Sequence, residues 1–316
     1  MNLELDDDQR EILGALTSLL DRHAGPARAI LLARTGEYDF ELDAALEKAG
    51  FDGAMDAQSL AGSLEAALIV EAVASAAGTT SLAAGSLVAP AVVGRAVEGP
   101  VALASGQSDA PLRFAAQARS LLWLDGDDAR LATLEPGDAE ALASSFGYPM
   151  GRVAPGVFER AESLGRDAGE RMRSWWRIAL AVETVGAMSA ALDQTVDYLK
   201  QRRQFGRTIA SFQAVQHRLA DCAVRVEGSR WLAYEAAYQR APAEAAACAA
   251  AHAIESARLI SRETHQLSGA IGFTREHDLH VWSMRLHALG SEQGGLAGHR
   301  SALATARWGT QQERPK

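Results

Sequence analysis

The chain has 316 residues, of which 48% are hydrophobic and 6% are aromatic, and it carries a net charge of −9. A chain of this length can bury a large core divided between two or three subdomains. Its acidic balance argues against a nucleic-acid partner, because no basic stripe is available to neutralise phosphates. Its two cysteines, Cys222 and Cys248, are too few for a disulfide framework and are predicted to be core thiols in a reducing cytoplasm.

Residues 1–96 are predicted to form an N-terminal helical domain. Asp6–Asp8 are expected to cap a first helix, because carboxylates accept hydrogen bonds from the free backbone N–H groups at a helix start. The apolar stretch 66–93 is interrupted by Glu71, so it predicts buried helices and no membrane span. The acidic N-terminus predicts no secretory signal, and we expect a cytoplasmic protein. Helices are predicted over residues 6–20, 40–49 and 64–77.

Residues 97–156 differ in composition and are predicted to form a shortened β domain. Short runs with β tendency alternate there with Gly and Asp pairs, which are typical of turns. From residue 157 to 310 the pattern is helical again, and the tail 311–316 is predicted to be disordered. The fold class is therefore mainly α with a small β domain. Strands are predicted over 100–104, 112–118, 120–124 and 129–134, and C-terminal helices over 158–202, 212–240, 242–269 and 278–308.

The most informative stretch is the run 198–221, in which an Arg-x-x-Phe-Gly turn joins two predicted helices. The planar guanidinium of Arg202 can clamp a pyrophosphate, Phe205 provides an aromatic plate, and Gly206 permits a tight reversal of the chain. This run, which continues as Phe-Gln-Ala-x-x-His-x-Leu-Ala-Asp, resembles the acyl-CoA dehydrogenase family. A second stretch, residues 266–278, resembles the Gln-x-x-Gly-Gly-x-Gly-Phe loop of the same family.

The resemblance implies an N-terminal helical domain, a middle β domain and a C-terminal four-helix bundle, with FAD bound at a subunit interface. An alternative for the second stretch is a simple helix C-cap and turn, since glycine commonly ends helices. Three histidines lie at helical spacing but lack a fourth ligand, so no metal site is predicted at His277, His280 and His287. The residues that the resemblance assigns to FAD contacts are Arg202, Gln204, Phe205, Gln266, Gly269 and Ala270, the last standing where the family has its second glycine.

Family members remove an α-proton from an acyl-CoA thioester with a carboxylate, while a hydride passes to the flavin. The two positions where the family places this base fall on Gln293 and Trp176, and neither side chain can take a proton from carbon. Three carboxylates could replace it. Glu292 adjoins one expected position, Glu183 lies about two turns beyond the other, and Glu276 is expected to pair locally. Glu292 is the best of these candidates, but the absence of a base is the preferred interpretation.

A chain that keeps the FAD contacts and lacks the base resembles the short subunit of bacterial heterotetrameric acyl-CoA dehydrogenases. These enzymes act on steroid side-chain CoA thioesters, and a homologous full-length subunit supplies the base. The resemblance also implies an electron-transfer flavoprotein as the electron acceptor. Two alternatives remain open: a self-sufficient homo-oligomeric dehydrogenase that uses Glu292 or Glu183, and a non-catalytic scaffold that keeps the bundle for oligomerisation.

Overall fold

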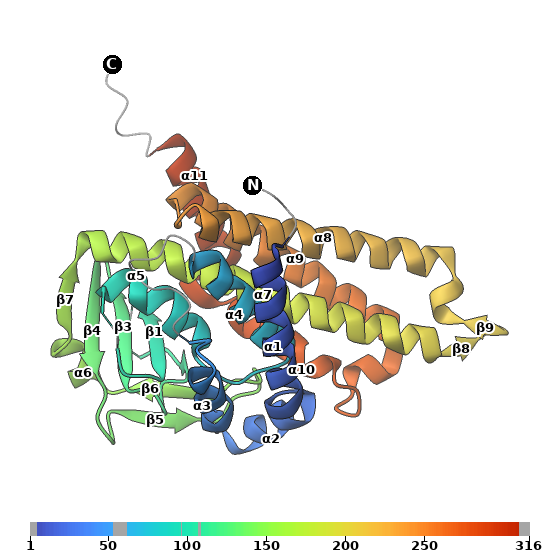
Figure 1. Cartoon of the computed structure of the whole chain (residues 1–316), viewed down its shortest axis with the longest axis horizontal. Helices are drawn as coiled ribbons and strands as arrows, with labels where there is room; N and C mark the ends of the chain where they lie inside the picture. Colours follow the sequence, from blue (N-terminus) through green and yellow to red (C-terminus); the bar gives the residue numbers. More distant parts are fainter. Residues whose placement is uncertain (1–4, 53–61, 96, 107–108, 310–316) are drawn as a thin grey trace.

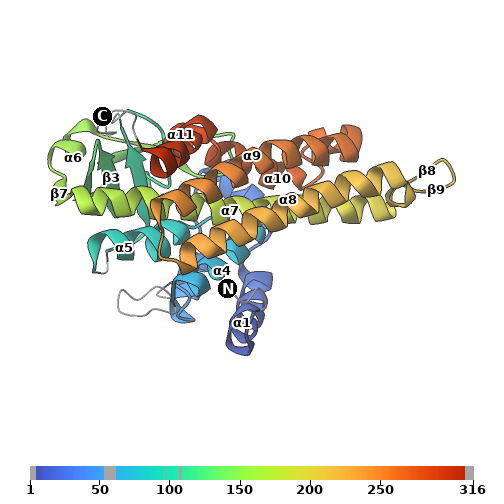
Figure 2. The same ribbon diagram turned by 90° about the horizontal axis from the view of Figure 1, so that it is seen from above.

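The computed structural model describes residues 5–52, 62–95, 97–106 and 109–309, and it confirms the predicted fold class. A small β region lies at one end, the short N-terminal helices lie beside the middle of the bundle, and long helices run the length of the molecule (Figure 1). Seen from above, these long helices lie side by side between the β region at one end and a hairpin of two short strands, β8 (Arg203–Gln204) and β9 (Arg207–Thr208), at the other (Figure 2). The predicted disordered tail, 311–316, lies outside the described residues.

The three predicted N-terminal helices begin within two residues of their predicted starts, whereas the helix over residues 26–35 was not predicted. The first starts after Asp6, whose carboxylate accepts a hydrogen bond from the backbone N–H of Gln9 at 2.8 Å. The backbone N–H of Asp6 in turn donates to Oε1 of the Gln9 side chain at 3.1 Å, which completes a capping box. The region comprises α1 (Asp7–His23), α2 (Pro26–Thr35), α3 (Phe40–Lys48), α4 (Gly62–Ser75), the π-helical turn η1 (Ala84–Val88) and α5 (Ala89–Val93).

The β region consists of a four-stranded sheet in the order β1-β3-β4-β7 and a three-stranded sheet in the order β2-β6-β5. Only the pair of β1 and β3 is parallel among the strand pairs of the described ranges. The strands are β1 (Val101–Ser105), β2 (Leu112–Arg113), β3 (Ser120–Asp125), β4 (Asp128–Thr133), β5 (Ala139–Leu142), β6 (Met150–Val153) and β7 (Glu162–Gly165), with the short helix α6 (Pro155–Glu159) before β7.

Two predicted boundaries in this region are wrong. The strand predicted over 112–118 ends at Arg113, because Phe114 adopts a positive φ of 65° and the chain turns there. The helix predicted from 158 begins only at Arg166, because residues 162–165 pair with β4 as strand β7. The Asp128 carboxylate accepts a hydrogen bond from the backbone N–H of Gly165 at 2.8 Å, which holds the end of this strand. Strand pairing across the sheet thus overrides the local helical pattern.

The C-terminal helices form a bundle around α7 (Arg166–Gln201), which is 36 residues long. The helix predicted over 278–308 is wrong as a single element, because it breaks at residues 290–294. Gln293, Gly294 and Gly295 all have positive φ values there, a conformation that a continuing helix cannot adopt. The other elements are β8 (Arg203–Gln204), β9 (Arg207–Thr208), η2 (Ile209–Ser211), α8 (Gln213–Tyr238), α9 (Ala243–Ser268), η3 (Gly269–Phe273), α10 (Leu279–Leu289), η4 (Glu292–Gly294) and α11 (Gly295–Trp308).

Small residues on α7 allow neighbouring backbones to approach it directly. A Cβ atom at Gly186 would lie 2.4 Å from the carbonyl oxygen of Glu71 on α4, and one at Gly169 would lie 2.1 Å from the carbonyl oxygen of Asp127. Any larger residue at these positions would push α4 or the β3–β4 turn away from the bundle.

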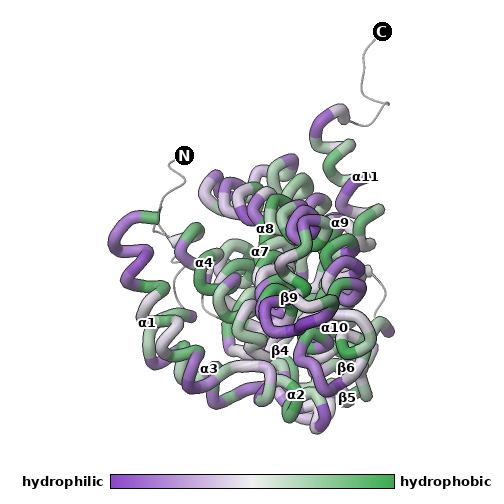
Figure 3. The backbone as a smooth tube through the Cα atoms, turned by 90° about the vertical axis from the view of Figure 1, so that its right-hand side faces the viewer, coloured by the Kyte–Doolittle hydropathy of each residue, from purple (hydrophilic) through white to green (hydrophobic). Residues whose placement is uncertain are grey.

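In Figure 3 hydrophilic segments lie along the β8–β9 hairpin. Within the described ranges no helix is both long and apolar enough to cross a membrane.

Candidate functional site

Arg113, at the end of β2, lies at the centre of a buried cluster that joins three of the residues singled out from the sequence. Its side chain is only 11% exposed. Its two terminal nitrogens donate hydrogen bonds to the two carboxylate oxygens of Glu183 on α7, at 2.9 and 3.0 Å. Its Nε donates to Oε1 of Glu292 in η4 at 2.5 Å. One guanidinium therefore binds two of the three carboxylates that were considered as catalytic bases.

Trp176 completes this cluster from the α7 side. Its indole Nε1 donates a hydrogen bond to Oε2 of Glu292 at 2.7 Å, so both oxygens of that carboxylate accept hydrogen bonds from fixed donors. Sequence reasoning singled out Trp176, Glu183 and Glu292 but missed Arg113. No sequence signal could have found it, because an arginine in a short predicted strand is most often on the surface.

Two neighbouring carboxylates favour the charged form of Arg113. Burial opposes the charge on Arg113, but the carboxylates of Glu183 and then Glu292 outweigh it, and the pKa of the guanidinium rises well above its usual value. The guanidinium also lies 4.9 Å from the centre of the Tyr148 ring, which is within cation–π range. The cavity beside these groups has a volume of about 20 Å³, which is room for a water molecule and not for an acyl thioester.

Gln293 is not part of the Arg113 cluster. It has a positive φ of 48°, and its side-chain Nε2 donates to the backbone carbonyl of Arg173 on α7 at 3.4 Å. The third candidate carboxylate, Glu276, lies in the loop before α10, where its backbone N–H donates to the hydroxyl of Thr274 at 3.4 Å. The structure therefore brings Glu183 and Glu292 together and leaves Glu276 apart from them.

The turn that carries the first motif lies at the far tip of the bundle. Arg202 ends α7, its backbone N–H donating to the carbonyl of Tyr198 at 2.8 Å, and its side chain is exposed. Gln204 donates from Nε2 to the carbonyl of Arg203 at 2.7 Å. Phe205 is 88% exposed and has a positive φ of 55°. The positive φ values of Phe205 and Gly206 are those of a two-residue hairpin loop between β8 and β9. The Phe205 ring lies 6.2 Å from that of Phe212, yet most of it is exposed, and exposed large apolar side chains are typical of binding surfaces.

The second motif forms the turn between α9 and α10, beside the same end of the bundle. Gly269 ends α9 with φ 66° and ψ −147°, a conformation that only glycine adopts readily. The helix-end alternative therefore accounts for this glycine, and Ala270 is exposed in the turn. A Cβ atom at Gly272 would lie 2.8 Å from that of Ser268, so close packing requires glycine there. Phe273 is 75% exposed and its ring lies 4.9 Å from the imidazole of His265.

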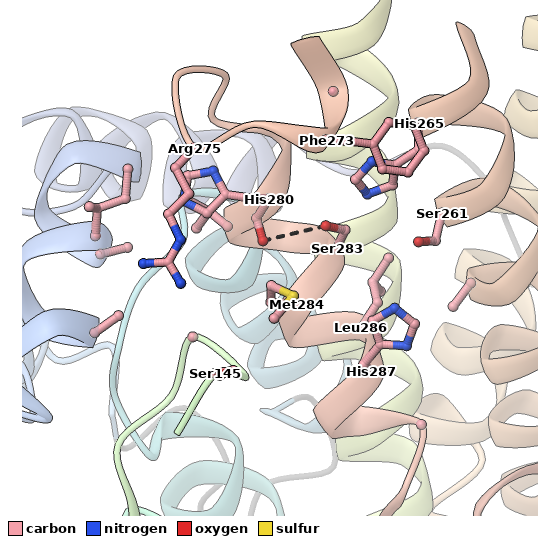
Figure 4. A pocket seen from close by; sticks show the side chains of 18 of the residues that line it. Ser145, Ser261, His265, Phe273, Arg275, His280, Ser283, Met284, Leu286 and His287 are labelled. Carbon is pink, nitrogen blue, oxygen red and sulfur yellow. Dashed lines mark hydrogen bonds between the residues drawn. The ribbon is translucent and has the colours of Figure 1, made fainter. Parts of the chain in front are cut away.

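A cavity of about 830 Å³ opens over α10, between α2, α9 and the loop before β6 (Figure 4). Gln266 lines it, whereas the other five predicted FAD contacts do not. Arg275 and His280 face its α2 side, and His265 and Phe273 face its α9 side. No Asp or Glu stands among the described residues that line it, although the whole chain is acidic. Its basic side chains are Arg34, Arg258, Arg262, Arg275, His265, His280 and His287.

The charge and size of this cavity match an anionic ligand of dinucleotide size. Cavities of about 300–1,000 Å³ are typical of small-molecule and cofactor sites, and arginines bind phosphate groups through paired N–H donors. Burial lowers the pKa of His265, so this imidazole is predominantly neutral at pH 7 and can both donate and accept hydrogen bonds. Sequence reasoning found Gln266 but missed the arginines, which come from α2, α9 and the loop before α10, segments far apart in the chain.

No group of three or more His, Cys, Asp or Glu side chains within the described ranges is placed to hold a metal ion. His280 donates from Nδ1 to the carbonyl of His277 at 2.9 Å, and the ring of His277 lies 5.3 Å from that of Tyr198. The histidines of this region therefore have local partners or line the cationic cavity.

Comparison with known proteins places these features in a family. Residues 169–305 match the family model described as the C-terminal domain of acyl-CoA dehydrogenase. The acyl-CoA dehydrogenase IpdE2 of Mycobacterium tuberculosis is 32% identical over 283 residues, which cover 86% of this chain and 80% of that protein. IpdE2 of Mycolicibacterium smegmatis is 36% identical over 138 residues, which cover 44% of this chain and 42% of that protein.

Solved structures share the whole fold. The ChsE4–ChsE5 complex of Mycobacterium tuberculosis matches with a TM-score of 0.80 and 20% identity, over 100% of both chains. The Tcur3481–Tcur3483 steroid acyl-CoA dehydrogenase matches with a TM-score of 0.77 and 23% identity, over 95% of this chain and 97% of that chain. Together with the near full-length similarity to IpdE2, these matches establish that the chain belongs to the acyl-CoA dehydrogenase family.

Proposed function

We propose that this chain is the FAD-contacting subunit of a heteromeric acyl-CoA dehydrogenase, in which a homologous full-length partner supplies the catalytic base. The observation that carries the proposal is the pairing of Arg113 with both Glu183 and Glu292. A general base needs a carboxylate that can reach the substrate and release its proton near the working pH. Here both candidates are bound to a permanent cation in a cavity of about 20 Å³, so neither serves as the base.

The residues of this chain fit FAD as a shared cofactor. The exposed Arg202 would bind the pyrophosphate of FAD, and the exposed Phe205 would pack against an aromatic ring of the dinucleotide. Gln266 would donate a hydrogen bond to the dinucleotide. The cationic cavity beside Gln266 supplies four arginines, of which Arg262 is paired with the carboxylate of Glu263 at 3.3 Å. FAD, when bound, accepts the hydride in this family. A structural relative, PigA, with a TM-score of 0.77 and 17% identity, has been solved with FAD and proline.

The proposed partner is a second acyl-CoA dehydrogenase chain of ordinary length. Two of the similar structures are complexes of paired chains, ChsE4–ChsE5 and Tcur3481–Tcur3483, and the second is described as a steroid acyl-CoA dehydrogenase. These names support a heteromeric steroid acyl-CoA dehydrogenase. We further propose a heterotetramer in the cytoplasm that acts on steroid side-chain CoA thioesters. A further similar structure is described as an electron-transferring flavoprotein of Acidaminococcus fermentans, which agrees with such a protein as the electron acceptor.

Co-expression with a homologous full-length chain tests the proposal through the flavin absorbance per chain. We expect little flavin on this chain alone and stoichiometric flavin with acyl-CoA oxidation in the complex. In that complex Glu292→Gln should keep turnover within a few-fold, while loss of the partner's base should lower it by about 10²–10⁴. A drop of that size from Glu292→Gln, with flavin content and assembly unchanged, would establish Glu292 as the base of a self-sufficient enzyme. A colourless complex would instead favour the scaffold alternative.

A further inference from the structure

A second cluster of basic side chains lies between α7 and the start of α11, and it has no role in the proposed function. His299, in the second turn of α11, is fully buried, and neither of its ring nitrogens has a hydrogen-bond partner. Arg177 Nε and Arg173 Nη1 on α7 are also buried without a partner. The two arginines lie four residues apart and therefore share one face of α7. Four polar atoms in one region thus have unused hydrogen-bonding capacity.

Local contacts place the start of α11 against α7 beside these side chains. Gln293, just before α11, donates from its side chain to the carbonyl of Arg173 at 3.4 Å, which fixes the η4 turn on α7. A Cβ atom at Gly298 would lie 2.3 Å from the carbonyl oxygen of Gln293, so the first turn of α11 packs directly on this turn. His299 follows Gly298, and the charge of Arg177 is close enough to disfavour protonation of its ring.

The charges of this cluster are not balanced within the chain. Arg173 pairs with the exposed Asp127 through Nη2 at 2.7 Å. No carboxylate of the described residues lies close enough to Arg177 to compensate for the hydration that its charge loses on burial. Burial, and then the charge of Arg173, lower its pKa to about 10, so it remains a cation at pH 7. Burial, and then Arg177, lower the pKa of His299 to about 4, which leaves that ring neutral.

Arg285 shows how the same fold treats a buried arginine that needs no ligand. It is 1% exposed and also lacks a carboxylate partner, yet its nitrogens donate to the carbonyls of Gly147 and Gly78 and to the hydroxyl of Thr79 at 2.7–3.2 Å. Its guanidinium also lies 4.6 Å from the centre of the Tyr148 ring. Arg177 has no such set of acceptors. A water molecule could accept its N–H groups, but only an anion would also balance its charge.

We propose that Arg173, Arg177 and His299 form a binding site for a small monovalent anion of the size of chloride, placed where α11 begins over α7. The anion would accept hydrogen bonds from Arg177 Nε, from Arg173 Nη1 and from the one N–H of the neutral imidazole. The anion would join His299 on α11 to the two arginines on α7. It would thereby reinforce the contacts that Gln293 and Gly298 already make between these helices. The proposal does not depend on the assignment of the catalytic base or of FAD.

Thermal unfolding of the full chain, co-expressed with its partner if required, tests this site with chloride as the probe. Sodium chloride is compared with sodium gluconate at equal ionic strength. A specific site predicts a saturable rise in Tm of about 2–4 °C at roughly ten times the Kd of chloride. Arg177→Met and His299→Leu should abolish this chloride-dependent increment, whatever their effect on Tm itself. The control Arg171→Met, an exposed position on the same helix, should retain it.

A crystal soaked in sodium bromide gives a measurement that needs no variant. Anomalous scattering should place one bromide within hydrogen-bonding distance of Arg177 and His299. The proposal is overturned if Tm follows ionic strength alone, or if ordinary water occupies this position while bromide binds elsewhere.

Discussion

The Arg113 cluster and the cationic cavity over α10 differ in how far their arginines are paired with carboxylates. At Arg113 one guanidinium meets two carboxylates, the charged atoms have partners, and almost no space remains. Over α10, four arginines and three histidines line about 830 Å³ with no carboxylate among the described lining residues, although Arg262 pairs with Glu263 beside the cavity. A buried ion pair needs no further partner, whereas a cavity with an excess of arginines favours an anionic ligand. The difference indicates which part of this chain receives a ligand and which is closed.

The largest effect is expected from removing the cation of the closed cluster. Arg113→Met leaves Glu183 and Glu292 buried without their partner, and we expect a loss of about 3–5 kcal/mol in the free energy of unfolding. Urea denaturation measures this loss. The triple variant Arg113→Met, Glu183→Gln, Glu292→Gln removes the unpaired charges and should recover most of it. A change below about 1 kcal/mol in the single variant would mean that the cluster is solvated and open.

The next effect concerns the tip of the bundle. Arg202→Ala should remove a charge-assisted contact to the pyrophosphate of FAD and weaken flavin binding by roughly a hundredfold, about 2–3 kcal/mol. Arg202→Lys should recover little, because an ammonium lacks the planar pair of donors. Flavin occupancy of the complex at limiting FAD is the measurement, and Arg10→Ala on α1 is the control. Full flavin occupancy in both Arg202 variants would show that Arg202 does not bind FAD and only ends helix α7.

A smaller effect is expected within the cationic cavity. Arg275→Gln removes one of four arginines and should weaken the binding of an anionic dinucleotide by about tenfold. The neutral cavity variant Ser145→Ala should bind as the wild type does. Calorimetric titration with FAD measures both, and the difference between them should shrink at high salt. If Arg275→Gln and Ser145→Ala bound FAD equally well, the dinucleotide would have to lie outside this cavity.

A separate effect concerns the pH dependence of stability, to which Asp43 in the N-terminal helices contributes. Burial raises the pKa of Asp43 on α3 to about 6. The folded state therefore holds this proton more tightly than the unfolded state, so the stabilisation is full below pH 4 and is lost as the pH rises through about 6. Asp43→Asn should flatten the fall in stability between pH 4 and 7. Parallel curves for the wild type and the variant in denaturation at several pH values would argue against this assignment.

Much of the architecture could be predicted because its signals are local. The capping box at Asp6 and Gln9 needs residues three positions apart, and the turn at Arg202 and Phe205 follows one helix directly. The predicted FAD contacts at the tip depended on the same kind of short motif. Boundaries failed where distant strands or glycines decided the outcome, as at β7 and at the break before α11.

The Arg113 cluster could not be predicted in this way. Arg113, Glu183 and Glu292 lie more than sixty residues apart in the chain, and only the packing of β2 and η4 against α7 brings them within hydrogen-bonding distance. The cationic cavity likewise combines α2, α9, α10 and the loop before β6. Local patterns determine helices, caps and short motifs because their interactions span a few residues. The pairing or isolation of a charge depends on which distant side chains share its space, and that is decided when the chain folds.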